Sequence, residues 1–316
     1  MADAPPPPLI EGLVHEEQLT IIHGPPESGK TYFTTLMGEM AAGAGEWGGK
    51  FNAPEDEDGN RRPVRVIYVL TDGSKFDMAE RIRWGFKQWP AADLNFLAYV
   101  PPLINLRSKE GLDELIEICA GFDVIMLDSL TSMSSGDISD NVTMQEVMQN
   151  IRVLKMAQPG RGVVVIHHDH RAKRDSSGDL IDEGKHAIAG SFHIGGQADL
   201  IWHITRSDPG RNAAAKVEQV KGRSRYRSLW TDSFYVHMDP DTGELTSEAL
   251  PDTAVSKRIA DWLKLVGSTS TKDVEKWAGT SGIGRTTVMR YLKGMVDTGE
   301  ASRLGRGQYQ YKGKIK

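Results

Sequence analysis

The residues with the clearest chemical potential form one run near the N-terminus: Gly24-Pro25-Pro26-Glu27-Ser28-Gly29-Lys30-Thr31. This run fits the pattern G-x-x-x-x-G-K-[ST], in which glycines let the backbone curl until successive N–H groups face a phosphate. A helix that begins there presents its positive N-terminus to the same anion. We expect Lys30 to reach the β- and γ-phosphates and Thr31 to bind Mg²⁺. The pattern predicts a site for ATP and Mg²⁺ that extends to Tyr32.

The context of this run favours a phosphate loop over a glycine-rich turn with an incidental lysine. An apolar strand is predicted over Gln18–His23, directly before the run. Apolar residues then recur at helical spacing from Gly29 to Met40. Strand, loop and helix in this order place the loop at the end of a sheet.

A second candidate site residue is Asp128, which follows four apolar residues, Val124–Leu127. An acid at the carboxyl end of a buried strand can hold the Mg²⁺ shell opposite a phosphate loop. Many strands end in Asp, so this signal gains its weight from the loop about a hundred residues earlier. We predict that Asp128 and Thr31 hold the metal together.

Apolar strands without alternation, interleaved with amphipathic helices, predict an α/β fold with a mostly parallel central sheet. The later strands follow one another too closely for parallel crossovers, so that end of the sheet is expected to be antiparallel. The predicted strands are 18–23, 64–70, 94–100, 124–127, 162–166, 198–205, 216–220 and 233–238, and the predicted helices are 29–40, 78–86, 112–120 and 141–156.

Charge divides the chain of 316 residues into two parts. Its formal net charge is −5, but residues 255–316 carry 13 basic and five acidic residues, which gives +8 there and −13 over residues 1–254. A basic end on an acidic body indicates a polyanion partner for that end, against the alternative of a solvated basic tail. We predict a flexible Pro-rich leader over 1–12, an ATPase domain over 13–248 and a small domain over 249–316, with a linker near Pro251.

Composition excludes several classes of protein. A single cysteine, Cys119, excludes a disulfide framework and fits a reducing compartment. No apolar run approaches the roughly 18 residues of a membrane span, and the first residues lack the apolar region of a signal peptide. We expect a cytoplasmic protein with no membrane partner. Pro5–Pro8 could alternatively serve as a polyproline ligand.

The basic end has the pattern of a winged helix-turn-helix. Apolar positions predict helices over 256–266, 270–277 and 285–296, followed by a hairpin around Gly305. In that architecture the third helix enters the DNA major groove and the wing touches phosphates. A winged helix that binds protein is the alternative, although it would more often be acidic or neutral. The predicted DNA contacts here are Arg285, Thr286, Thr287, Arg290, Lys293, Arg303 and Arg306.

With these motifs placed, the chain from about Leu9 to Met238 resembles the RecA-like P-loop ATPases, and within them the hexameric replicative helicases of the RepA type, relatives of the DnaB core. The resemblance includes Val66–Gly73, similar to the strand that ends in the catalytic glutamate, with Arg81 later. Val164–His168 resembles a strand that ends in a His-His pair. The further matching segments are Leu9–Leu13, Trp47–Phe51, Gly190-Ser191 with Asp199, and Lys221-Gly222-Arg223.

The resemblance implies roles for individual residues. Asp72 would be the general base, with a turn or helix-cap aspartate as the alternative. His167 would sense the γ-phosphate, with a core histidine as the alternative. Lys221 and Arg223 would reach the nucleotide of a neighbouring subunit, which implies a homo-oligomer, here a hexameric ring. Arg225 and Arg227 are alternative candidates for the arginine finger, the arginine that reaches the neighbouring subunit's nucleotide.

Residues 167–170 (His-His-Asp-His) are of types that bind metal ions. Adjacent strand residues point to opposite faces, however, so all four side chains cannot bind one ion. The loop that follows would face the central channel in this fold class, where basic residues track single-stranded DNA. A solvated loop is the alternative. The predicted contacts are Arg171, Lys173, Arg174 and Lys185.

Two positions depart from the family pattern. Asp72 stands where the family usually has Glu, which puts fast hydrolysis in doubt, and Ala189 stands where an Arg is usual. The sequence therefore favours an ATP-driven DNA helicase with a winged-helix tail. Two alternatives remain: a RecA-like recombination or annealing ATPase, and a DNA-binding regulator that uses nucleotide as a switch.

Overall fold

The computed structural model describes residues 6–48, 51–101, 103–135, 140–169, 192–206, 214–222, 233–238 and 244–249, and parts of 259–312. The chain divides into two compact units, Met1–Leu229 with Val236–Ser247, and Trp230–Tyr235 with Glu248–Lys316. The main division lies after Ser247, and the predicted domain bounds, 13–248 and 249–316, stay a prediction. The predicted linker around Pro251 lies outside the described residues.

The first unit is built on a nine-stranded sheet in the order β13-β12-β11-β10-β3-β9-β8-β6-β7. Six neighbouring strands, from β10 to β7, run parallel, whereas β11 runs antiparallel to β10. The predicted α/β class and the antiparallel end are confirmed. The strands are β3 (Leu19–Gly24), β6 (Val66–Leu70), β7 (Phe96–Tyr99), β8 (Val124–Asp128), β9 (Gly162–His168), β10 (Leu200–Arg206), β11 (Ala215–Gly222), β12 (Phe234–Met238) and β13 (Leu245–Ala249).

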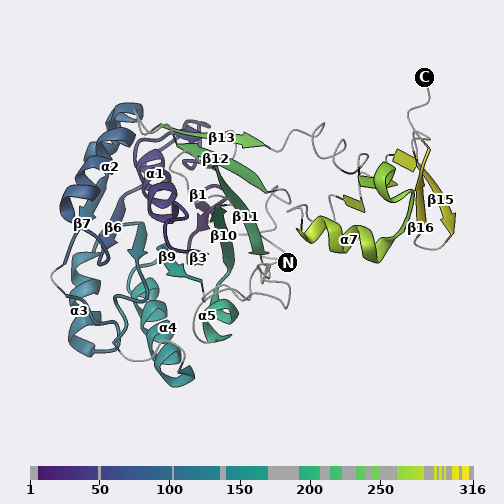
Figure 1. Cartoon of the computed structure of the whole chain (residues 1–316). Coiled ribbons are helices and arrows are strands. Elements are labelled where there is room, and N and C mark those ends of the chain that lie inside the picture. The colour runs from purple at the N-terminus through teal and green to yellow at the C-terminus, as the bar shows by residue number, and fades with distance from the viewer. Residues whose placement is uncertain are drawn as a thin grey trace. The chain divides into compact units, whose positions relative to one another are not determined.

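Helices cover both faces of this sheet, with α1 and α2 on one face and α3, α4 and α5 on the other (Figure 1). Three of them begin at side chains that accept a hydrogen bond from the first turn, those of Ser74, Ser108 and Asp140. The helices are α1 (Lys30–Ala42), α2 (Lys75–Gln88), α3 (Lys109–Ile118), α4 (Asn141–Met156) and α5 (Phe192–Gln197), with a short 3₁₀ helix, η1 (Pro90–Leu94), after α2.

Alternation along the strands assigns each side chain to one of these two faces. Leu19, Ile21 and Ile201 pack with Met148 and Ile151 of α4 in one core cluster. The residues between them face α1, where Trp202 meets Phe51 with ring centroids 5.6 Å apart. This assignment continues to the carboxyl ends of the strands, where the candidate site residues lie.

The start of the chain differs from the prediction. Pro8–Ile10 form strand β1, which pairs antiparallel with β2 (Val14–His15), and both Leu9 and Ile10 are buried. The expected flexible leader over 1–12 is therefore wrong for residues 8–12, because burial of two apolar side chains holds this segment against the body. Residues 1–5 of that leader lie outside the described residues.

The second unit has a small core of its own, which includes Ile259, Leu263, Val274, Val288 and Leu292. Its described elements are helical residues 262–266, β14 (Ser268–Ser270), α7 (Thr271–Thr280), helical residues within 288–296, and the hairpin of β15 (Ala301–Gly305) and β16 (Gln308–Tyr311). The three strands form one antiparallel sheet in the order β14-β16-β15. Trp262 and Trp277 stack with centroids 4.8 Å apart.

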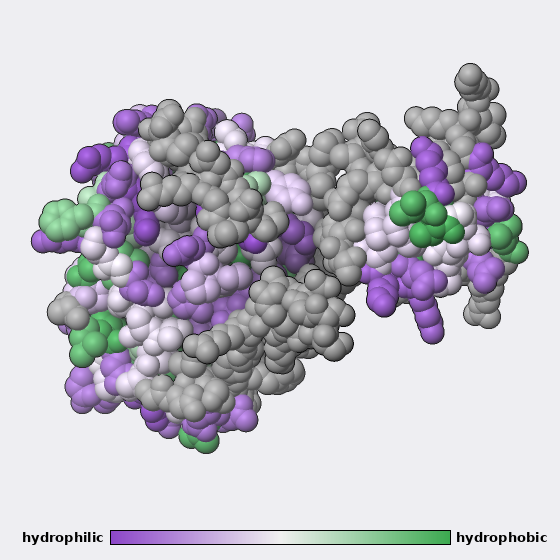
Figure 2. Space-filling model, viewed as in Figure 1, coloured by the Kyte–Doolittle hydropathy of each residue, from purple (hydrophilic) through white to green (hydrophobic). Residues whose placement is uncertain are grey.

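On the face seen in Figure 2, apolar residues form small separate patches within a hydrophilic surface. Within the described part of the chain, no helix is both long and apolar enough to cross a membrane.

One buried acid in this fold has an energetic consequence. Glu39 of α1 is 1% exposed and lies against α2, where a Cβ on Gly85 would come within 1.9 Å of its carboxylate Oε2. Its Oε1 has no hydrogen-bond partner among the described residues. Burial raises the pKa of the Glu39 carboxyl to about 9, so the folded protein keeps this side chain neutral at pH 7.

We predict that Glu39→Gln stabilises the protein at pH 8 more than at pH 5. The unfolded chain releases this proton near pH 4.5 and the folded chain only near pH 9, so wild-type stability falls as pH rises between these values. The limiting slope is about 1.4 kcal/mol per pH unit. Urea unfolding at both pH values measures it, with the exposed Glu114→Gln as control. Equal effects of Glu39→Gln at pH 5 and pH 8 would contradict the prediction.

Candidate functional site

The predicted phosphate loop connects the central strand β3 to helix α1. Gly24 packs so closely on β10 that a Cβ there would lie 2.0 Å from the backbone oxygen of Ile204. Gly29, at the N-cap of α1, has φ +94°, a conformation that side chains rarely adopt. The two glycines are therefore required by close approach and by backbone conformation, respectively.

Lys30 is buried at the start of α1, and its ammonium donates to loop carbonyls, at 2.9 Å to Gly24 and 2.6 Å to Pro25. Burial lowers the pKa of Lys30 to about 8, against the opposing effect of nearby carboxylates. The buried Ser28 hydroxyl has no partner among the described residues. A buried ammonium and an unsatisfied hydroxyl in one loop fit a phosphate ligand, whose oxygens would satisfy both.

The predicted metal pair is assembled at this loop. The hydroxyl of Thr31 donates to Oδ2 of Asp128 at 2.8 Å, and the hydroxyl of Tyr68 donates to the same oxygen at 2.7 Å. Burial raises the pKa of Asp128, and both hydroxyl donors oppose that rise. A hydroxyl and a carboxylate oxygen are the ligand types that Mg²⁺ takes, so these residues fit the cation.

Tyr68 was not predicted from the sequence as a site residue. It lies on β6, where its ring is fully buried, and only the parallel pairing of β6 with β8 brings it to Asp128. The sign of this role in the sequence is the hydroxyl group of Tyr68 within the otherwise apolar run Val66–Leu70. Tyr68 orients the carboxylate that would meet the metal, as an outer-shell partner does.

The two histidines that end β9 have different environments. His168 lies on the α1 side, with Nε2 3.8 Å from Oδ2 of Asp72, and both side chains are partly exposed, 31% and 61%. His167 points to the other face, is fully buried, and lies 3.4 Å from the hydroxyl of Thr131. The structure therefore pairs His168 with Asp72 and buries His167, and the predicted γ-phosphate role of His167 stays a prediction.

Tyr32 lies beside the phosphate loop but packs on α2. Its ring stacks on Trp84 with centroids 5.8 Å apart, and the guanidinium of Arg81 lies 4.7 Å from its centroid. This packing fixes α2, and with it the segment that follows Asp72, against the start of α1.

The structure describes only one of the two residues, Lys221 and Arg223, that we predict to reach the nucleotide of a neighbouring subunit. Lys221 donates to backbone oxygens at the end of α5, at 2.7 Å to both Gly195 and Ala198. It therefore satisfies helix carbonyls within its own chain, and its reach to a neighbouring subunit stays a prediction. Arg223, Arg225 and Arg227 lie outside the described residues.

Most of the predicted DNA contacts also fall outside the described part of the chain. Lys293 and Arg303 are described, and both are exposed on the second unit. The others lie outside it: Arg171, Lys173, Arg174, Lys185, Arg285, Thr286, Thr287, Arg290 and Arg306.

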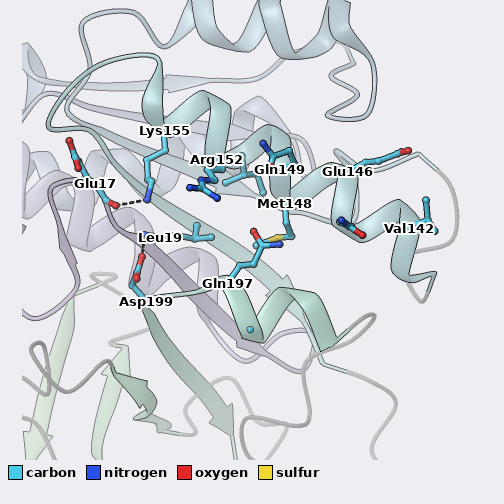
Figure 3. Close-up of a pocket in the computed structure, with 13 residues that line it drawn as sticks. Glu17, Leu19, Val142, Glu146, Met148, Gln149, Arg152, Lys155, Gln197 and Asp199 are labelled. Carbon is cyan, nitrogen blue, oxygen red and sulfur yellow. Dashed lines mark hydrogen bonds between the residues drawn. The ribbon is translucent and has the colours of Figure 1, made fainter.

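A groove of about 890 Å³ lies away from the phosphate loop, between α4, α5 and the first residues of β3 (Figure 3). Its lining combines apolar Leu19 and Met148 with charged Lys155 and Asp199. Lys155 donates to the backbone oxygen of Glu17, and Asp199 accepts from the backbone N–H of Leu19 at 3.0 Å. These bonds fasten α4 and the start of β10 to β3, and no predicted site residue lines the groove.

We predict that Tyr68→Phe raises the Mg²⁺ concentration needed for half-maximal nucleotide binding by about 10-fold, the usual size of an outer-shell effect. The variant removes one donor from Asp128 and leaves the ring packing intact. A fluorescent ATP analogue titrated at several Mg²⁺ concentrations measures this, with Tyr99→Phe on β7 as control. An unchanged Mg²⁺ requirement would show that Tyr68 acts in packing alone.

One of three comparisons with known proteins assigns the chain to a family. A comparison with curated proteins found no match. Among solved structures, the RadB recombinase is similar, with 16% identity, a TM-score of 0.46, and coverage of 73% of this chain and 90% of that chain. The family model described as "AAA domain" matches residues 2–173, which include the phosphate loop, Asp72, Asp128 and the end of β9. The chain belongs to this AAA-domain family of RecA-like P-loop ATPases.

Proposed function

We propose that the protein is an ATP-driven DNA motor, a replicative helicase of the RepA type that works as a hexameric ring. The observation that carries the proposal is the gathering of three elements at one edge of the sheet. These are the phosphate loop with Lys30, the Thr31–Asp128 pair, and the exposed Asp72–His168 pair. Together they would supply phosphate binding, a metal site and a candidate base.

The chemistry follows from these positions. Asp72 would accept a proton from the attacking water, and His168 beside it would orient that carboxylate and meet the γ-phosphate. Mg²⁺, when bound at Thr31 and Asp128, would neutralise charge on the phosphates. Because Asp72 is 61% exposed, a second subunit could close the site and bring an arginine, for which Arg223 is the candidate.

Asp72 also supports a second candidate, a regulatory ATPase that uses nucleotide as a switch. Aspartate is one methylene shorter than the usual glutamate, so its carboxylate reaches less far toward a bound nucleotide. Slow hydrolysis would suit a switch better than a motor. The two candidates differ in turnover and in its response to DNA.

For the second unit we propose a winged helix-turn-helix that holds duplex DNA. The order of helix, strand, helix, helix and hairpin, with the central position of β16 in its sheet, supports this assignment. Its net charge of +8 over residues 255–316 supports a polyanion ligand. The core loop with Arg171, Lys173, Arg174 and Lys185 would bind the single strand.

We predict that the wild-type protein separates a forked duplex in the presence of ATP and Mg²⁺, and that single-stranded DNA stimulates its ATPase. Lys30→Ala should abolish both activities, because the loop then lacks its cation for the phosphates. Lys87→Ala on the exposed face of α2 serves as the control. Strand displacement and particle symmetry by electron microscopy are the measurements.

Three results would contradict the helicase proposal. ATP hydrolysis without strand displacement would exclude it, filaments in place of rings would favour a recombination ATPase, and turnover indifferent to single-stranded DNA would favour the switch.

We predict that Lys293→Glu and Arg303→Glu each weaken duplex DNA binding and flatten its salt dependence by about one unit in the log–log slope. Both side chains are exposed on the second unit. Fluorescence anisotropy at several salt concentrations measures the slope, with Lys87→Glu in the first unit as control. An unchanged slope in both variants would remove this surface from the proposed interface.

A further inference from the structure

A second cluster of titratable side chains lies directly behind the phosphate loop, on the face of the sheet opposite α1. His203 of β10, His23 of β3 and His167 of β9 stand side by side at one register level, and Glu218 of β11 lies opposite His203. Asp169, just after β9, completes the cluster. The catalytic scheme above uses none of His23, His203, Asp169 and Glu218.

One carboxylate connects two of these rings. Oδ1 of Asp169 lies 2.6 Å from Nδ1 of His23, and Oδ2 lies 3.0 Å from Nε2 of His203. The exposed fractions of the three side chains are 8% for Asp169, 0% for His23 and 5% for His203. This bridge joins the carboxyl ends of three neighbouring strands.

The composition of the cluster suits a metal ion, but its geometry suits a hydrogen-bonded carboxylate. The rings of His23 and His203 stack with centroids 4.4 Å apart and planes 10° apart. An imidazole binds a metal through a lone pair in its ring plane, and two nearly parallel, stacked planes share no such point. Asp169 spans the gap because its two oxygens serve one ring each.

The bridge holds one positive and one negative charge. Burial opposes a charge on His203, but the carboxylates of Asp169 and Glu218 outweigh it and raise the pKa of His203 to about 9. Burial lowers the pKa of His23, and the stacked His203 adds to this effect. Asp169 keeps a lowered pKa despite burial, because both rings donate to it. At neutral pH the cluster therefore contains a charged His203, a neutral His23 and two ionised carboxylates, Asp169 and Glu218, the second of which also pairs with Lys216.

The bridge is attached to the phosphate loop at its first residue. His23 immediately precedes Gly24, and the backbone N–H of Asp169 donates to the oxygen of Gly24 at 3.2 Å. The same oxygen accepts from Lys30 at 2.9 Å, and the charge of Asp169 acts on the Lys30 ammonium. So close to the loop, the negative charge of Asp169 would repel nucleotide phosphates and attract the Lys30 ammonium to itself, unless a cation neutralised that charge.

We propose that His203 is a positioning residue of the phosphate loop, and that its imidazolium neutralises Asp169 so that Lys30 and the loop can accept nucleotide phosphate. This inference rests on the proposed nucleotide binding at the loop and adds a residue from the far side of the sheet. The other charged groups that face the pair are Lys30 from α1 and, through Glu218, Lys216 of β11.

Charge compensation is tested by removing first one charge and then both. His203→Asn leaves Asp169 ionised and uncompensated, and we expect the dissociation constant of a fluorescent ATP analogue with Mg²⁺ to rise about 10-fold or more. His203→Asn with Asp169→Asn removes both charges, and affinity should return to within about 3-fold of wild type. His237→Asn on β12 is the matched control.

A purely structural role for His203 gives the opposite pattern. It predicts that the double variant, which loses more hydrogen bonds, binds no better than the single variant, and that result would overturn the proposal. Absence of nucleotide binding in the wild type would instead refute the proposed function.

A pH series provides a test that needs no destabilising variant. Wild-type affinity should fall as pH rises through about 9, where His203 loses its proton. The double variant should lack this step at pH 9, and its remaining step should be that of Lys30, at a lower pH than in the wild type because Asp169 no longer raises the pKa of Lys30. Equal pH profiles for the wild type and the double variant would overturn the proposal even if His203→Asn alone failed to fold.

Discussion

The parallel register of β10, β3, β9 and β8 is the constraint on which the rest of the structure depends. It brings the carboxyl ends of these strands to one edge and fixes, by alternation, which face each side chain occupies. On β9, His168 falls on the α1 side with Asp72, whereas His167, and Asp169 just after the strand, fall on the α4 side. A shift of one residue in this register would move His168 to the α4 side and His167 and Asp169 to the α1 side. The phosphate loop would then lose both the Asp72–His168 pair and the Asp169 bridge.

Patterns that are local in the sequence predicted their part of this arrangement well. The phosphate loop is a contiguous run with a strand before it and a helix after it, and β3 and α1 lie where that pattern placed them. Helix α4 has the predicted bounds, Asn141–Met156, because its apolar face is visible in the sequence, and in the structure the Asp140 side chain caps its start. Asp128 was also identifiable, since an acid that ends an apolar run marks the carboxyl edge of a parallel strand.

Relations between strands could not be predicted in the same way. Tyr68 reaches Asp128 because β6 pairs with β8, and His203 reaches Asp169 because β10 lies beside β3, across sequence separations of 60 and 34 residues. Neither pairing leaves a spacing signal in one sequence. The leader was misjudged for a related reason, because Pro8–Ile10 becomes ordered only through its partner β2 and the core beneath it.

The same strand pairings determine which charged groups lie next to the phosphate loop. Residues 1–254 carry a net charge of −13, and three carboxylates, Asp169, Asp128 and Asp72, act on Lys30. An anionic ligand can bind in such a body only where the acids nearest the loop are compensated. Asp128 accepts from two hydroxyl groups and would meet Mg²⁺, and Asp169 accepts from two histidines, one of them charged. Among the described residues, Asp72 has an ion pair with His168 alone, and its 61% exposed carboxylate is the one of the three that solvent reaches most.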